Sequence, residues 1–384
     1  MVIKIYLDIS RHPFYESLIV YPPEEIEYIN INKKLFLGEY NKLSVYHSFK
    51  NNLFRKFISK IQYMTSIPRI KIIRKKYFDL YHSGRGVFVE GADYVMDLEY
   101  VTSPYSLHWD LSKRKISKFI LRKLFLKSNL KFILPHSYSA MYSIKDFLGL
   151  DFFNKIKEKV EVLYPAEEPK VNEYKKLNKD KIILLFVASN IGNFIAKGGL
   201  EVLYTFLELR NKYDLELWIR SDVPNIIKEK YKNIIKFIPR INRNELFEIY
   251  KQSDIFVYPT YRDTWGYVLL EAMSTSLPII TSNTFAVPEI VKDYKNGLII
   301  DVGKYKWNNG YLLNEEISKN KKIYWKPKKE IIERLKEKIS ELIEDKKLYE
   351  EISKNNLYEV INGRFSIKER NRKLKEIYES AVRK

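Results

Sequence analysis

The stretch IFVYPTYRDTWGYVLLEAMSTSLPIITS, residues 255–282, decides the fold class of this chain. Residues 255–258 form a short apolar run typical of a buried strand, residues 266–274 repeat apolar side chains with a helical period, and residues 278–281 are a second apolar run. A strand, a helix and a strand in such close succession predict two parallel strands joined by a crossover helix.

The same alternation extends outward from this stretch. It predicts a doubly wound α/β fold, in which helices cover both faces of a parallel sheet. The further strand-like runs are residues 182–187, 215–219, 234–238 and 298–301, with amphipathic segments such as 244–251 between them. Less regular runs in the first half predict a second sheet, and they are residues 2–7, 70–73, 78–82, 94–98, 132–134 and 160–163.

The length of 384 residues favours two domains, because a single core rarely organises so long a chain. Residues 166–180 are polar and carry clustered charges, which is typical of a linker. We therefore predict two Rossmann-like domains, over residues 1–165 and 181–364, and a final helix over 365–384 that packs back toward the first domain. Ligands of open parallel sheets bind beyond the carboxyl ends of the strands, so the two domains would face each other across a cleft.

Composition narrows the class of protein. The sequence has no cysteine, which excludes disulfides, thiolate catalysis and cysteine-ligated zinc or iron–sulfur centres. No apolar run approaches the roughly 20 residues needed to cross a bilayer, and Met1 leads directly into a strand-like run instead of a signal peptide. These features predict a cytoplasmic protein.

The net charge of +20 is concentrated in the first half of the chain. Residues 40–78 hold ten Lys or Arg and residues 111–145 hold nine, and neither segment contains Asp or Glu. Within them, residues 42–76 and 113–131 also show a helical apolar period. The apolar positions are Phe49, Leu53, Phe54, Phe57, Ile58 and Ile61 in the first segment, and Ile116, Phe119, Ile120, Leu124 and Leu130 in the second.

Basic amphipathic segments of this kind suit an anionic membrane surface, where each Lys or Arg near the headgroups contributes about 1 kcal/mol. The apolar faces could equally pack into the N-terminal core and leave the lysines in solvent. A nucleic acid is the least favoured partner, because the sequence carries no motif for recognising one. Peripheral attachment to the cytoplasmic membrane face therefore stays open beside simple core packing.

Residues 258–273 contain an acidic pair, Asp263 and Glu271, separated by seven residues. The motifs that follow are Leu277-Pro-Ile-Ile-Thr-Ser, Val287-Pro-Glu-Ile-Val and Asn296-Gly-Leu-Ile. Together they resemble the donor-site region of glycosyltransferase family 4, whose signature is two glutamates at this spacing. The chain departs from that signature only in having aspartate as the first acid.

The resemblance implies roles for the acidic pair. Asp263 would contact the donor sugar and Glu271 the ribose, and Arg262, Gly266 and Glu289 would lie in the same donor site. Taken singly, Asp263 could be a helix N-cap and Glu271 an ordinary acid on a helix surface.

A second patch, Ala196-Lys-Gly-Gly-Leu, resembles the family element that opens the C-terminal domain. The resemblance implies that Lys197 and Gly198 bind the donor pyrophosphate. A cation at a helix start suits this task, because the helix N-terminus adds a partial positive charge. Ser189 stands where many family members carry an arginine, so Arg262 or Arg220 would supply a further cation. The alternative for Lys197 is a solvated loop lysine.

The first half resembles the family only in outline. His82, in Phe78-Asp-Leu-Tyr-His-Ser-Gly, lies where family members place an active-site histidine, which could hydrogen-bond the sugar or move a proton. A structural role is the alternative for a single histidine. Glu99 is a second candidate on the acceptor side. With Lys197 and Asp263, His82 completes the residues that we predict to be catalytic.

The resemblance implies a retaining glycosyltransferase of the GT-B type that uses a nucleoside diphosphate sugar. The acceptor would be a glycan or a lipid-linked precursor. No cofactor or metal is expected, because the sequence lacks the Asp-x-Asp motif of metal-dependent GT-A enzymes. The alternatives are a sugar-nucleotide epimerase or phosphorylase on the same fold, a basic nucleic-acid-binding protein and a catalytically inactive subunit.

Overall fold

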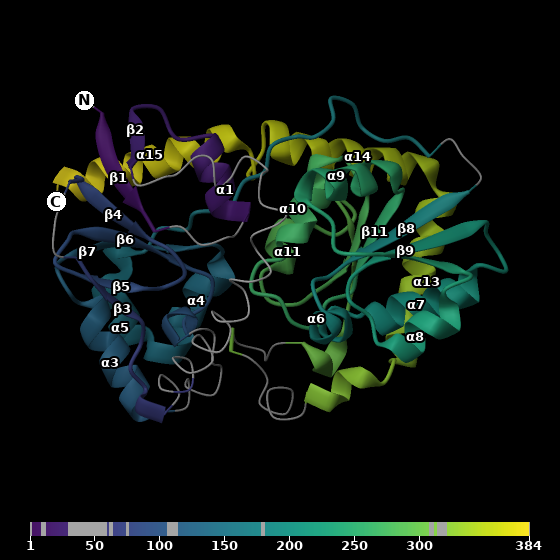
Figure 1. Ribbon diagram of the computed structural model, residues 1–384, viewed down its shortest axis with the longest axis horizontal. Coiled ribbons are helices and arrows are strands. Elements are labelled where there is room, and N and C mark those ends of the chain that lie inside the picture. The colour runs from purple at the N-terminus through teal and green to yellow at the C-terminus, as the bar shows by residue number, and fades with distance from the viewer. Residues whose placement is uncertain are drawn as a thin grey trace. The chain divides into compact units, whose positions relative to one another are not determined.

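The computed structural model describes residues 2–8, 13–29, 60, 64–73, 77–105, 114–177, 181–306, 311–312 and 321–383. The chain divides into two compact units (Figure 1). Unit 1 comprises Met1–Pro165, Gly310–Leu312 and Lys368–Lys384, and unit 2 comprises Ala166–Asn309 and Leu313–Ile367. Each unit has its own parallel sheet and its own core.

Unit 1 is built on a five-stranded sheet in the order β2-β1-β4-β6-β7, and all its strand pairs are parallel. The central strands β4 and β6 are short and wholly buried, and they carry the polar residues His82, Ser83 and Asp97 among apolar ones. The strands are β1 Ile3–Leu7, β2 Ile26–Ile29, β4 Leu80–Ser83, β6 Tyr94–Leu98 and β7 Leu130–Pro135. The helices are α1 Pro13–Val20, α3 Lys115–Phe125, α4 Tyr138–Leu148, α5 Leu150–Ile156 and α15 Ile367–Arg383.

A separate parallel pair, β3 (Ile70–Ile72) and β5 (Phe88–Glu90), also belongs to unit 1. Phe88 of β5 packs on Phe125 of α3 with their ring centroids 5.4 Å apart. A 3-10 turn, Ser103–Tyr105, lies close by, since the backbone N–H of Arg69 donates to the carbonyl of Pro104.

Unit 2 is built on a six-stranded parallel sheet in the order β10-β9-β8-β11-β12-β13. Helices α7 and α13 lie on one face and α9, α10 and α14 on the other (Figure 1). The strands are β8 Ile182–Val187, β9 Leu215–Arg220, β10 Ile235–Ile238, β11 Ile255–Tyr258, β12 Ile279–Ser282 and β13 Leu298–Ile300. The helices are α6 Ile191–Ala196, α7 Gly199–Leu209, α8 Asn225–Tyr231, α9 Arg243–Gln252, α10 Tyr267–Ser274, α11 Val287–Ile290, α13 Lys329–Glu344 and α14 Lys346–Ile361.

Helix α15 supplies unit 1 with side chains from the far end of the chain. Arg370 is only 2% exposed, and its guanidinium donates to the Ser17 hydroxyl at 2.7 Å and to the Tyr21 carbonyl at 2.8 Å. The hydroxyl of Tyr378 lies 3.2 Å from that of Tyr28 on β2. Unit 1 is therefore discontinuous in sequence.

The predicted doubly wound α/β class is confirmed by two sheets whose strand pairs are all parallel within the described residues. Strands β2 and β5 were not predicted. Both are very short, and a pattern over three or four residues cannot be told from a loop. Residues 160–163 run beside β7, with Glu161 N–H donating to Ile133 at 3.0 Å and Leu163 N–H to Pro135 at 2.9 Å, but form only a single bridge.

The structure tests the predictions for only one of the two basic segments. Residues 42–76 lie mostly outside the described residues. In residues 113–131 the predicted helix is confirmed but its predicted apolar face is split: α3 buries Leu124, together with Leu121 and Phe125, while Ile116 and Phe119 are 56% and 57% exposed. Leu130 belongs to β7 and not to the helix. The helix thus has a second apolar stripe that the described residues of its own unit do not cover.

None of the helices in the described part of the chain has both the length and the apolar content that a membrane span requires.

Candidate functional site

Lys197 and Asp263 meet at the carboxyl edge of the unit 2 sheet. Lys197 follows α6, and Asp263 lies in the loop between β11 and α10. The Lys197 ammonium lies 2.6 Å from Asp263 Oδ2 and donates to the Arg262 carbonyl at 2.5 Å. The Tyr258 hydroxyl, at the end of β11, donates to the same Oδ2 at 2.7 Å. The structure therefore joins two of the predicted site residues directly.

Burial and charge set the protonation of this pair, since the two side chains are only 13% and 15% exposed. Burial alone would raise the pKa of Asp263, but the adjacent Lys197 outweighs it and holds that pKa below its usual range. Burial lowers the pKa of Lys197, and Asp263 opposes this shift. Asp263 thus remains a carboxylate, which accepts hydrogen bonds and donates none.

Gly198 allows the two loops to approach each other. Its φ is +80°, and a Cβ there would lie 2.5 Å from the Pro259 carbonyl oxygen. The backbone N–H of Tyr261 also donates to the Ala196 carbonyl at 3.1 Å. Only glycine fits this position, because a side chain would push the turn carrying Lys197 away from the loop carrying Asp263.

Gly266 begins α10 in the left-handed conformation, with φ of +89°. A Cβ at this position would lie 3.7 Å from Asp263 Oδ2, so the predicted donor-site glycine lies beside the predicted donor-site acid. The first turn of α10 starts immediately after Gly266.

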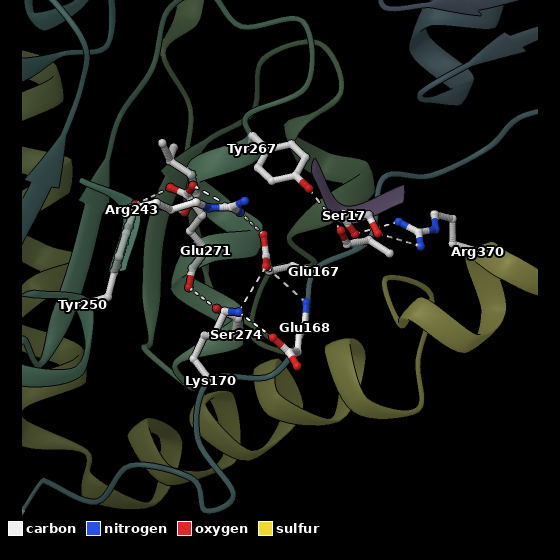
Figure 2. A network of polar contacts seen from close by, with 12 residues as sticks. Ser17, Glu167, Glu168, Lys170, Arg243, Tyr250, Tyr267, Glu271, Ser274 and Arg370 are labelled. Atoms are coloured by element: carbon white, nitrogen blue, oxygen red, sulfur yellow. Dashed lines mark hydrogen bonds and ion pairs between the residues drawn. The ribbon is translucent and has the colours of Figure 1, made fainter. Parts of the chain in front are cut away.

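Glu271 lies on α10, 6% exposed, in a network of polar groups that Figure 2 shows. The Tyr250 hydroxyl donates to its Oε2 at 3.2 Å, and the Arg243 guanidinium lies 3.8 Å from its Oε1. Arg243 also forms an ion pair with Glu167. Burial raises the pKa of Glu271 to about 7, against the opposing effect of Arg243 and with a further upward contribution from Glu167.

Within the described part of the chain, no hydrogen bond or ion pair joins Glu271 to Lys197 or Asp263. Glu271 is held by groups from α9 and from residue 167, whereas Asp263 is held by Lys197 and Tyr258. The two acids of the predicted pair therefore have different partners, and their roles in donor binding stay predictions.

The remaining donor-side predictions have these positions. Arg262 accepts the Lys197 hydrogen bond through its carbonyl, and its side chain is half-buried. Glu289 lies on α11, and its carbonyl accepts from Arg364 at 2.5 Å. Arg220 ends β9 and donates to the Ala188 carbonyl at 2.8 Å. Burial lowers the pKa of Arg220, and Glu271 is among the groups that oppose this shift.

Four partners of the site were not predicted, and they are Glu167, Arg243, Tyr250 and Tyr258. Tyr258 could have been found, because it ends a predicted strand at the ligand-binding edge of the sheet. Arg243 directly follows Asn242, which with Glu245 forms a capping box that is visible in the sequence. The sequence gives no indication of the contact between Glu167 and Arg243, since 76 residues separate them.

In unit 1, His82 is fully buried. Its Nδ1 lies 2.5 Å from the Tyr378 hydroxyl and its Nε2 lies 3.0 Å from Asp97 Oδ2. His136 approaches the other oxygen of Asp97 at 3.7 Å, and Tyr15 donates to Asp97 Oδ2 at 2.8 Å. Both ring nitrogens of His82 are thus in contact with other side chains of unit 1, and its catalytic role stays a prediction.

Asp97 is the centre of this buried cluster. Burial alone would raise its pKa, but His82 and His136 outweigh burial and hold the pKa of Asp97 below its usual range. Glu99 follows β6 and is half-buried, and its charge contributes to raising the pKa of Tyr15 after burial and Asp97. His82 and Glu99 lie in unit 1, whereas the predicted donor-side residues lie in unit 2.

The overall fold is that of GT-B glycosyltransferases. HepE of Anabaena, solved in complex with UDP and glucose, matches with a TM-score of 0.59 at 13% identity, and the match covers 99% of this chain and 100% of HepE. Sucrose-phosphate synthase of Thermosynechococcus elongatus matches with a TM-score of 0.55 at 14% identity, covering 85% of this chain and 77% of the synthase.

Residues 173–307 match the family Glycosyl transferases group 1, so the second half of the chain carries a domain of that family. CapM of Staphylococcus aureus, a capsular polysaccharide biosynthesis glycosyltransferase, is 25% identical over 142 residues, which are 35% of this chain and 36% of CapM. An uncharacterised 41.2 kDa protein of the Klebsiella pneumoniae cps region is 24% identical over 53% of this chain. The chain spans 56% of that protein's length, so these matches cover about half or less of the relatives.

Proposed function

We propose that this chain is a glycosyltransferase that moves a sugar from a nucleoside diphosphate sugar to an acceptor hydroxyl with retention of anomeric configuration. The observation that carries the proposal is the contact of Lys197 with Asp263 at 2.6 Å, at the carboxyl edge of a parallel sheet and inside a group 1 glycosyltransferase domain. A cation and a carboxylate at that edge suit a ligand that has phosphates at one end and hydroxyls at the other.

Each group has a part in holding the donor. Lys197 would bind the diphosphate together with the first-turn amides of α7, which have no partner within their helix. Asp263 would accept hydrogen bonds from sugar hydroxyls, and Glu271 from the ribose. One relative in fold supports a nucleotide ligand in general terms, since HepE was solved both with UDP and glucose and with UDP-glucose.

Negative charge develops on the diphosphate during the reaction, and positive groups of the site would lie where that charge appears. The bond between the anomeric carbon and the diphosphate breaks, and its electron pair leaves with the diphosphate. The acceptor oxygen bonds to the anomeric carbon, and the proton of the acceptor hydroxyl passes to the departing diphosphate. Lys197 and the α7 amides would stabilise the developing negative charge. Because these groups supply the positive charge, we expect turnover to persist after treatment with EDTA, and a loss restored by Mg²⁺ would contradict that expectation.

A thermal-shift panel of UDP-, GDP-, ADP- and TDP-sugars tests donor binding. A ligand at about 100 times its Kd stabilises the folded chain by about 2.7 kcal/mol, which gives a measurable rise in Tm. We expect one nucleotide class to raise Tm, and the rise to disappear in Asp263→Ala and Glu271→Ala. A wild-type response in both variants would remove the assignment of the site.

The acceptor is inferred from helix α3. Exposed apolar residues, Ile116 and Phe119 on the helix and Leu126 at its C-cap, are interspersed with basic side chains, and the Lys123 ammonium lies 4.5 Å from the Phe119 ring centroid. A helix that exposes both apolar and cationic groups fits an anionic lipid surface. We therefore infer a lipid-linked acceptor at the cytoplasmic membrane face.

Flotation with vesicles tests this surface. We expect binding to phosphatidylglycerol vesicles at low salt and loss of binding in Phe119→Ser, because a buried phenylalanine side chain contributes about 1.5–3 kcal/mol. Tyr358→Ser is the matched control, since Tyr358 is 59% exposed on α14 of unit 2. If the wild-type chain does not float with anionic vesicles, the membrane proposal fails and the donor proposal is unaffected.

A further inference from the structure

The turn that ends β4 presents an arginine at the carboxyl edge of the unit 1 sheet. β4 is the middle strand of the five, and Gly84, Arg85 and Gly86 follow it directly. Arg85 is exposed, and within the described ranges its guanidinium has neither a hydrogen-bond nor an ion-pair partner. Ligands of open parallel sheets bind at this edge.

The backbone conformation at position 85 favours glycine over arginine. A Cβ at Gly84 would lie 2.4 Å from the Tyr15 hydroxyl oxygen, and one at Gly86 would lie 2.9 Å from Pro104 N, so close packing requires both glycines. Arg85 has a φ of 55°, in the left-handed region where glycine is accommodated without cost. A bulky side chain held in such a conformation indicates a use for that side chain.

A second guanidinium lies next to the turn. The Arg69 side chain donates to the Ser103 carbonyl at 2.6 Å and to the Arg85 carbonyl, and its Nε is buried without a hydrogen-bond partner. Burial and the charge of Arg85 lower the pKa of Arg69 to about 10. Two positive charges therefore lie close together, and Arg69 is bound by carbonyl oxygens instead of a carboxylate.

Two of the acidic groups nearby already have partners of their own. The Lys71 ammonium lies 3.1 Å from Asp8 Oδ1, and Asp97 is enclosed by the buried histidines. Tyr15, Glu99 and Asp8 favour the charged form of Arg69, but each contributes less than the opposing Arg85.

We propose that Arg85, with Arg69 beneath it, forms an anion site for a phosphate group on the acceptor. This inference rests on the proposed function, because it names the class of acceptor that unit 1 would take. A guanidinium binds phosphate oxygens through two parallel N–H···O bonds, a geometry that lysine does not offer. The acceptor class is thus a phosphorylated molecule, either a soluble sugar phosphate or a lipid-borne phosphate.

Calorimetric titration of the full chain with inorganic pyrophosphate tests the site. The reference protein is the Lys197→Met variant, which lacks the proposed donor cation. It is compared with the double variant that carries both Lys197→Met and Arg85→Gly. Glycine suits the backbone at position 85, so the second substitution should leave Tm unchanged or slightly higher. We expect Arg85→Gly to weaken pyrophosphate binding at least tenfold, and Lys155→Gln, on the exposed face of α5, to leave it unchanged.

Two ligand arms separate the sources of phosphate. Pyrophosphate in solution represents a soluble acceptor, and phosphatidylcholine vesicles doped with phosphatidic acid represent a lipid-borne phosphate. A loss in Arg85→Gly with either ligand supports the site and assigns its source, while unchanged binding in both arms overturns it. Nucleotide-sugar binding to the wild-type chain is measured in a separate experiment. If no nucleotide sugar binds, the proposed function is refuted, and the anion site would remain without a role in binding an acceptor.

Discussion

The carboxyl edges of the two sheets each bring an aspartate against basic side chains, and they do so differently. In unit 2, Asp263 and Lys197 are carried by loops and remain 15% and 13% exposed. In unit 1, Asp97 lies inside strand β6, fully buried between His82 and His136. An acid that retains some contact with solvent can exchange its partner for a ligand, whereas a fully enclosed one holds its neighbours in place. We therefore expect a binding role for Asp263 and an architectural role for Asp97.

The largest expected effect is on stability, from Asp97→Ala. Removing one member of a buried charged cluster leaves the others without compensation and costs about 3–5 kcal/mol. Chemical denaturation followed by circular dichroism should show this loss. Glu158→Ala, at an exposed acid of unit 1, is the control and should change little. A loss below about 1 kcal/mol in Asp97→Ala would mean that the cluster is not architectural.

Lys197→Met should act on turnover more than on folding. Removing one group that stabilises a developing anion lowers kcat by about 10²–10³-fold in enzymes with such sites. The measurement is release of nucleoside diphosphate with a donor found in the thermal-shift panel. Lys212→Met removes an exposed ion pair of the same unit, with Glu344, and should leave kcat unchanged. Equal activity in the two variants would dissociate Lys197 from the reaction.

Asp263→Asn tests whether the partly exposed aspartate of unit 2 makes the site prefer a nucleotide sugar over a nucleoside diphosphate. A ligand that takes Lys197 away from Asp263 leaves that carboxylate uncompensated unless the ligand also offers hydroxyl donors. The wild-type site should therefore favour the nucleotide sugar over the nucleoside diphosphate. In the asparagine variant we expect the sugar nucleotide to bind about tenfold more weakly, a loss of about 1.4 kcal/mol, while the diphosphate binds at least as tightly as before. Equal weakening of both ligands in paired titrations would refute this mechanism.

The smallest effect is a pH dependence of donor affinity from Glu271. Its pKa of about 7 means that the carboxylate able to accept ribose hydroxyls forms only as the pH passes neutrality. Donor affinity should rise by at most about tenfold between pH 6 and pH 8, and Glu271→Gln should flatten the profile. Titrations at three pH values would show it, and an unchanged profile in the variant would assign the titration to another group.

The same shift has a consequence for stability, with the opposite sign. The folded chain holds this proton more tightly than a free glutamate of pKa 4.5 would. The stability contributed by Glu271 is therefore fully present below about pH 4.5 and is lost as the pH rises through about 7. Donor binding and fold stability should thus change in opposite directions over this range.

Much of unit 2 could be predicted from the sequence, because β8 and β11 are continuous apolar runs bounded by polar residues. The resemblance implied that Lys197 and Asp263 share one site but not that they contact each other; Tyr258 and Gly198 show why that contact forms. Unit 1 was harder: its strands are short, and the burial of His82 depends on Tyr378, which lies 296 residues away. Periodicity carries no information about contacts of that range.

Helix α3 shows a second limit of periodicity. Its apolar residues are too numerous for one face, so the period alone could not decide that Leu121 and Leu124 turn inward and Phe119 outward. That choice depends on which surface of unit 1 is available for packing. Residue 167 is a similar case, because the ion pair between Glu167 and Arg243 follows from chain geometry and not from any local pattern.

The return of α15 to unit 1 affects how the chain folds as it is synthesised. Unit 2 lies almost entirely within residues 166–367, so the ribosome delivers all of it before the side chains of Arg370 and Tyr378 emerge. Unit 1 starts first but cannot complete its core until those last residues arrive, which reverses the usual order in which the N-terminal domain matures first. A free chain truncated after residue 367 should therefore have a protease-resistant second half and a first half that is still cleaved.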